Sequence, residues 1–145
     1  MSDDSFTESI KTSASPSDII SKIGDVSKWW AKDFQGASKN VGDSFVVKFS
    51  AGDTFTIKVS EIVPDQKVVW DVIDAYQGWV KEPREWVGTK IEWDITNENG
   101  ISEIKFTHVG LVSRLECFGT CSKAWDYLMQ KSFAALLNTG EGLPA

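Results

Sequence analysis

Titratable side chains are sparse on the predicted inward faces of this chain, where Glu8 and the single histidine, His108, are the main candidates. His108 follows Ile104 and Phe106 at every second position, so its side chain is predicted to face the apolar side of a strand. Acid or base catalysis would require a carboxylate or hydroxyl beside the ring, which Glu116 or Tyr127 would have to supply. We expect a buried, neutral histidine hydrogen-bonded to a protein group, with contact to a ligand as the alternative.

No other pattern of residues indicates catalysis. The chain has no G-x-S-x-G sequence around a serine nucleophile, and no His-Asp-Ser constellation is evident around the single histidine. Its glycines do not form G-x-G-x-x-G after a predicted strand, so nucleotide binding is not indicated. We therefore predict no catalytic residue and no cofactor.

The two cysteines are the next candidates for chemistry. Cys117 and Cys121 lie four residues apart in a predicted helix, so both would project from one face of it. In a reducing compartment we expect free, buried thiols. A zinc site shared with His108 lacks a fourth ligand and matches none of the usual zinc-finger spacings, so we predict no metal site.

Aromatic side chains are the most abundant candidates for ligand binding. Seven Trp and eight Phe give more aromatic volume than a minimal core requires, so some are expected to line a cavity. The segment 74–86 joins two predicted strands by a connection longer than a hairpin needs. It either caps the edge of the sheet or forms a flexible cavity mouth, with Trp79 as a contact and Arg84 as a partner for an anion.

The elements that position these candidate residues are predicted to be mainly β-strands. The evidence is the alternation of apolar and polar residues, together with residues typical of turns. Asn99-Gly100 between two alternating runs is a strong signal for a hairpin, and residues 6–12 have the pattern of an edge strand. The predicted strands cover residues 6–12, 45–49, 55–59, 67–73, 89–96 and 104–108.

Helices are predicted in three places. Ser15 and Pro16 are start signals for a short helix, which Gly24 ends, and Trp29 and Trp30 lie on a second short helix. A long helix is predicted over 115–138, where apolar residues recur three and four positions apart. This order predicts an α+β fold in which a curved antiparallel sheet wraps around the C-terminal helix.

Charge and hydropathy limit the partners. A formal net charge of -6 without a basic cluster disfavours nucleic acid. The opening MSDDSFTES lacks the positive charge and apolar run of a signal peptide, and no segment approaches the ~18 apolar residues of a membrane span. We expect a cytoplasmic protein with no membrane insertion.

Several short motifs resemble one family. They are Trp29-Trp30, the sequence EWVGT at 85–89, THVGL at 107–111, AWDYL at 124–128 and LLNTGEG at 136–142. In order and spacing the chain resembles the START-like, or polyketide cyclase and lipid-transport (SRPBCC), superfamily, within the group of activator of heat-shock-protein-90 ATPase homologues. The resemblance implies a helix-grip fold over residues 1–145 as one domain. Ala124 departs from the group, which more often has Gly there, and its extra methyl would narrow the groove beneath the helix.

The resemblance and the aromatic content together predict a carrier or sensor that binds a small apolar or aromatic ligand between the sheet and the C-terminal helix. One alternative is a protein-interaction module that contacts a chaperone or a second copy of itself, because Trp125, Met129, Phe133 and Leu137 form a second apolar stripe on the long helix. The other is a cyclase or dehydratase that uses His108. The residues predicted to contact the ligand are Trp30, Trp70, Trp79, Trp86, Trp93, His108 and Trp125.

Overall fold

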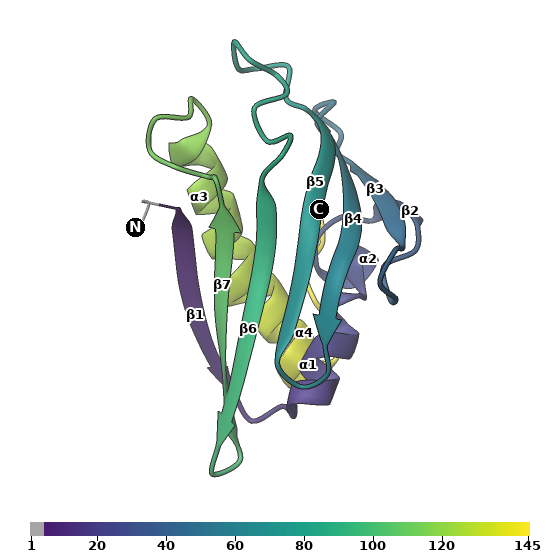
Figure 1. The fold of residues 1–145 in the computed structure, drawn as a ribbon, viewed down its shortest axis with the longest axis vertical. Coiled ribbons are helices and arrows are strands. Elements are labelled where there is room, and N and C mark those ends of the chain that lie inside the picture. The colour runs from purple at the N-terminus through teal and green to yellow at the C-terminus, as the bar shows by residue number, and fades with distance from the viewer. Residues whose placement is uncertain (1–4) are drawn as a thin grey trace.

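A curved antiparallel sheet forms one layer of the protein, as seen in a computed structural model that describes residues 5–145 (Figure 1). Residues 1–4, which begin the segment used above against a signal peptide, lie outside the described part. Within that part the sheet has seven strands in the order β1-β7-β6-β5-β4-β3-β2. The strands are β1 (Phe6–Thr12), β2 (Asp33–Gly36), β3 (Ser44–Lys48), β4 (Thr54–Val63), β5 (Lys67–Tyr76), β6 (Lys90–Glu98) and β7 (Ile101–Val109).

The helices cover one face of this sheet, and the C-terminal helical segment crosses it diagonally (Figure 1). This arrangement confirms the predicted helix-grip fold, with the two short helices directly after the first strand. In the described part of the chain, no helix is both long and apolar enough to cross a membrane. The helical elements are α1 (Pro16–Ile23), α2 (Val26–Trp29), α3 (Phe118–Tyr127), η1 (Leu128–Phe133) and α4 (Ala134–Thr139).

Local signals explain most of these elements. The Ser15 side chain accepts a hydrogen bond from the backbone N–H of Asp18 at 3.2 Å and caps α1. Asn99 and Gly100 both have positive φ, at 56° and 82°, as the tight turn between β6 and β7 requires. The predicted edge position of β1 is confirmed, because β1 pairs with β7 alone among the strands.

Two features differ from the prediction. The short strand β2 was not predicted, because Asp33–Gly36 is mostly exposed and has no alternation of apolar residues. It forms by pairing with β3, where Phe34 lies opposite Val47. The long helix is also not a continuous α-helix, because its middle turns, η1, have π-helical hydrogen bonding.

The π-helix explains how one helical segment buries two apolar stripes. A π-helix has a wider turn than an α-helix, so neighbouring residues can share one face. Leu128, Met129, Ser132 and Phe133 are all buried in η1. Met129 and Phe133, which belonged to the second apolar stripe, are therefore part of the core and not an exposed surface.

Ser132 connects this π-helix to two other parts of the chain. Its hydroxyl donates to the carbonyl oxygen of Trp29 at 2.7 Å and accepts from the backbone N–H of Leu143 at 2.8 Å. Ser132 itself is fully buried. The hydroxyl therefore holds α2, η1 and the C-terminal residues together.

Replacing Ser132 with Ala is expected to lower the free energy of unfolding by about 2 kcal/mol, because a buried carbonyl and a backbone N–H both lose their partner. Urea unfolding followed by circular dichroism measures the change. Ser21→Ala, on the exposed side of α1, is the matched control and should stay within about 0.5 kcal/mol of the parent protein. Equal stability of the two variants would show that the Ser132 hydroxyl does not join these segments.

Candidate functional site

Residues 77–89 connect β5 to β6 and are called the 77–89 connection below. A cavity of about 450 Å³ opens at the end of the sheet where this connection meets α3. Strand β4 and the C-terminal residues complete its walls. Its volume lies within the range of pockets that hold small molecules. The lining residues are Trp30, Phe49, Asp53, Phe55, Gln77, Trp79, Trp86, Thr120, Cys121, Ala124, Trp125, Tyr127, Leu128, Leu143, Pro144 and Ala145.

Stacked aromatic rings form the inner wall. The rings of Phe55 and Trp86 stack with centroids 4.3 Å apart, and Trp86 stacks on Trp125 at 6.1 Å. The ring centroids of Trp30 and Trp125 lie 5.3 Å apart. These rings make the inner wall apolar, and each of them is largely buried against its neighbours.

The mouth of the cavity is more polar than its inner wall. The indole Nε1–H of Trp79 donates to Oδ2 of Asp53 at 3.0 Å, which connects the 77–89 connection to the turn between β3 and β4. Trp79 is 46% exposed, and Tyr127 on α3 is also exposed. The 77–89 connection therefore contributes to the cavity mouth, which was one of the two alternatives considered for this loop.

The C-terminal residues form a wall that the sequence did not predict. Their backbone pairs with the end of α2, because the N–H of Ala145 donates to the carbonyl of Trp30 at 3.0 Å and the N–H of Lys32 donates to Ala145 at 2.9 Å. A side chain at Gly142 would collide with the carbonyl of Lys28 and come within 3.1 Å of that of Ser132. Glycine at this position allows the backbone to pass close to α2.

His108 is fully buried, and both of its ring nitrogens are bonded to protein groups. The Nε1–H of Trp125 donates to Nδ1 at 3.0 Å, so Nε2 carries the proton of the neutral ring and donates to Oγ1 of Thr89 at 2.8 Å. The Thr89 hydroxyl then donates to the carbonyl of Trp86 at 2.6 Å. This relay connects α3, β7 and the 77–89 connection.

Burial keeps His108 neutral. Desolvation lowers the pKa of His108 to about 3. Because neither nitrogen is free, the ring has no lone pair or proton to offer a substrate without first breaking the relay. The sequence predicted burial and one bonded nitrogen, and the structure shows a second one.

The two cysteines are free and buried, as predicted. The Nε1–H of Trp86 donates to Sγ of Cys117 at 3.3 Å, and Nε2–H of Gln77 donates to Sγ of Cys121 at 3.4 Å. A hydrogen bond between the two thiols raises the pKa of Cys117 and lowers that of Cys121. Among the described residues, no three His, Cys, Asp or Glu side chains gather into a group that could hold a metal ion.

The structure brings four of the seven predicted contact residues to the cavity. Trp30, Trp79, Trp86 and Trp125 line it, whereas Trp70, Trp93 and His108 do not. Gln77 and the C-terminal residues were missed, because neither an isolated glutamine in a loop nor an apolar tail has a sequence signal for a cavity wall.

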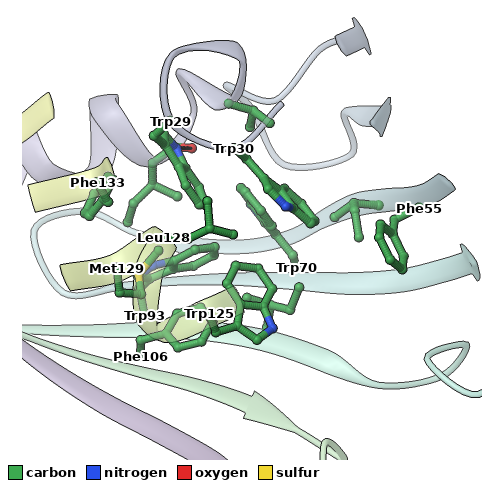
Figure 2. Close-up of a cluster of buried hydrophobic side chains, with 14 of the residues drawn as sticks. Trp29, Trp30, Phe55, Trp70, Trp93, Phe106, Trp125, Leu128, Met129 and Phe133 are labelled. Carbon is green, nitrogen blue, oxygen red and sulfur yellow. Dashed lines mark hydrogen bonds between the residues drawn. The ribbon is translucent and has the colours of Figure 1, made fainter. Parts of the chain in front are cut away.

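Trp70 and Trp93 belong to the filled part of the interior (Figure 2). Trp70 packs edge to face against Trp93 at 4.5 Å and stacks with Trp29 at 6.3 Å. Phe106 contacts Trp93 from the next strand at 5.5 Å. The space between the sheet and the helical segment is therefore occupied here by side chains.

Glu8, on the edge strand β1, is a second titratable group with a shifted pKa. Partial burial, followed by a hydrogen bond and charge repulsion from Asp126, raises the pKa of Glu8 to about 7. Glu8 does not line the cavity. Its titration nevertheless contributes to the pH dependence of stability, with a sign opposite to that of His108.

The pH dependence of stability tests the buried state of His108. Between its ordinary pKa of 6.5 and its native pKa of about 3, the unfolded chain binds a proton that the native protein does not. The unfolded state is therefore favoured as the pH falls. From about pH 6 to about pH 5, His108 lowers the free energy of unfolding by about 1.2 kcal/mol. The native form of Glu8 retains its proton to higher pH than the unfolded form, so its contribution stabilises the protein over the same range.

Comparing His108→Gln with the parent protein separates the two contributions, because Glu8 is present in both. The difference in free energy of unfolding between the parent and the variant should shrink by about 1.2 kcal/mol from about pH 6 to about pH 5, as measured by urea titration. A constant difference across this range would mean that His108 takes up protons equally in the native and unfolded states.

Solved structures provide the comparison with known proteins, since no family model and no curated protein sequence matches the chain. The Aha1 dimer from Colwellia psychrerythraea is similar, with a TM-score of 0.76 and 24% identity over 94% of this chain and 98% of that chain. DynU16, from the dynemicin biosynthetic locus, has a TM-score of 0.68 and 17% identity over 97% of this chain and 49% of that chain. CalU16 from Micromonospora echinospora has a TM-score of 0.65 and 11% identity, over 92% and 74% of the two chains. These similarities show that the chain has the helix-grip fold, which is the fold that the resemblance of its motifs implied.

Proposed function

We propose that the protein binds a small, largely apolar or aromatic molecule in the cavity and acts as its carrier or sensor. The observation that carries this proposal is the wall of stacked rings formed by Phe55, Trp86 and Trp125 around about 450 Å³ of space. A space of this volume and lining is typical of sites that hold a small molecule with most of its surface buried.

The chemistry of the cavity favours binding over turnover. His108 is engaged at both nitrogens, so the general acid or base of a cyclase or dehydratase is missing at the position where the sequence suggested it. Cys121 is the thiol in the cavity wall, and its Sγ accepts a hydrogen bond from Gln77. The free thiols support a reducing, cytoplasmic location for this carrier.

A protein-interaction role is the second candidate, and one comparison favours it: the Colwellia Aha1 structure is a dimer. The apolar stripe that suggested this role from the sequence does not support it, because Met129 and Phe133 are buried. An interaction surface would instead involve the exposed rings at the cavity mouth, Trp79 and Tyr127. Light scattering distinguishes a monomer from a homodimer, and a chaperone ATPase assay tests a chaperone contact.

Filling the cavity from α3 tests ligand binding. Ala124→Phe places a ring in the cavity mouth and should weaken binding of a hydrophobic fluorescent dye by about tenfold or more, equivalent to about 1.4 kcal/mol. Lys123→Phe is the control, because Lys123 is an exposed neighbour that does not line the cavity. Dye fluorescence titrations on both variants provide the affinities.

The two variants should have similar stability, since both residues are on the solvent-exposed part of α3. Equal dye binding by Ala124→Phe and Lys123→Phe would place the dye outside the cavity. Absence of binding by the parent protein across a panel of dyes, flavonoids and fatty acids would contradict the carrier function itself.

A further inference from the structure

We propose that the cavity takes an organic cation, with the apolar part of the ligand inside and its positive charge at the mouth, beside the Asp53 carboxylate and the ring of Trp79. This charge preference rests on the proposed binding function and adds the chemical class of the ligand and its orientation. An aromatic quaternary ammonium compound or a protonated aromatic amine has the required chemistry.

The cavity lining carries charge of one sign. Among the described residues that line it, Asp53 alone has a charged side chain. No lysine, arginine or histidine of residues 5–145 forms an ion pair with this carboxylate. By contrast, Asp71 and Asp74 on β5 are paired with Lys90 and Arg84, at 2.6 and 3.1 Å. The negative charge at the mouth is therefore uncompensated, and a cationic ligand would supply its partner.

The Asp53 carboxylate is held in position before a ligand arrives. The N–H of Gly52 donates to the carbonyl of Phe49 at 2.9 Å, and the N–H of Phe49 donates to the carbonyl of Asp53 at 3.0 Å, which closes the turn between β3 and β4. Oδ2 accepts the hydrogen bond from Trp79 at 3.0 Å. Oδ1 has no hydrogen-bond partner among residues 5–145 and is not a buried atom, so it is open to a ligand.

Aromatic rings at the mouth suit a cation. Trp79 and Tyr127 line the cavity and are 46% and 48% exposed, so these rings are accessible, unlike the buried rings of the inner wall. The face of an indole or phenol ring is electron-rich and attracts a cation. The hydrogen bond from the Trp79 N–H to a carboxylate polarises the indole and strengthens this attraction.

The inner part of the cavity suits the apolar part of the ligand and not its charge. Trp86, Trp125 and Leu128 are buried apolar residues of the wall. An anionic ligand would lose hydration without gaining a cation, and it would be repelled by Asp53 and by the formal net charge of -6. The charge of a bound cation therefore belongs at the mouth.

Three probes of similar size separate charge from shape. 1-Methylquinolinium is a permanent cation, 1-methylnaphthalene is its neutral isostere, and 1-naphthoate is an anion. Equilibrium dialysis on the full chain, read by the absorbance of each probe, should show the cation binding about threefold or more tightly than the neutral isostere, although water hydrates the cation better. Naphthoate should bind most weakly.

Asp53→Asn removes the charge and keeps an oxygen that can accept from Trp79. It should weaken binding of 1-methylquinolinium by about fivefold and leave 1-methylnaphthalene within about twofold. Asp65→Asn is the matched control, because Asp65 is exposed, does not line the cavity and changes the net charge equally. This control should leave the affinities for all three probes unchanged.

The salt dependence of the parent protein provides a measurement that needs no variant. Raising sodium chloride from about 50 mM to about 500 mM should weaken binding of 1-methylquinolinium and leave 1-methylnaphthalene unaffected, because salt screens the carboxylate. Equal affinities for these two probes, tightest binding of naphthoate, or equal effects of Asp53→Asn and Asp65→Asn would overturn the charge preference while leaving the cavity as a binding site. If no probe binds the parent protein, the binding function itself fails.

Discussion

The hydrogen-bonded relay through His108 is the interaction on which the cavity depends. It begins at the indole of Trp125 on α3 and ends at the carbonyl of Trp86 in the 77–89 connection, with Thr89 between them. These two tryptophans are also the stacked rings of the inner wall. The hydrogen-bonded relay therefore joins the two residues whose rings form this wall. The only histidine in the sequence acts as a positioning residue.

The interior is divided between a filled part and an open part. Around Trp70 and Trp93 the rings interlock from sheet to helix, and this region supplies the apolar burial that stabilises the fold (Figure 2). At the other end, Phe55 and Trp86 stack on each other, and space remains beside them. Ligand contacts and core packing therefore use the same residue type, and composition alone does not tell them apart.

Much of the scaffold could be predicted because it is local. Alternation located β1, and the cap at Ser15 located α1, because each signal lies within a few residues of its effect. The site depended on contacts between distant segments, which a single sequence does not reveal. Gln77 meets Cys121 across 44 positions, and Trp70 is indistinguishable in sequence from a cavity residue until Trp29 is seen to cover it. The inward direction of His108 was predictable, whereas its two partners were not.

The π-helix η1 has a consequence for how the helical segment tolerates changes in length. A π turn contains about one residue more than an α turn, so a deletion of one residue within Leu128–Phe133 can be absorbed by a return to α-helical hydrogen bonding. The same deletion within α3 would rotate Cys121 or Trp125 by about 100° away from its partners. One-residue deletions among related sequences should therefore cluster in η1. A sequence alignment that places such a gap elsewhere would shift the aligned residues of α4 by one position.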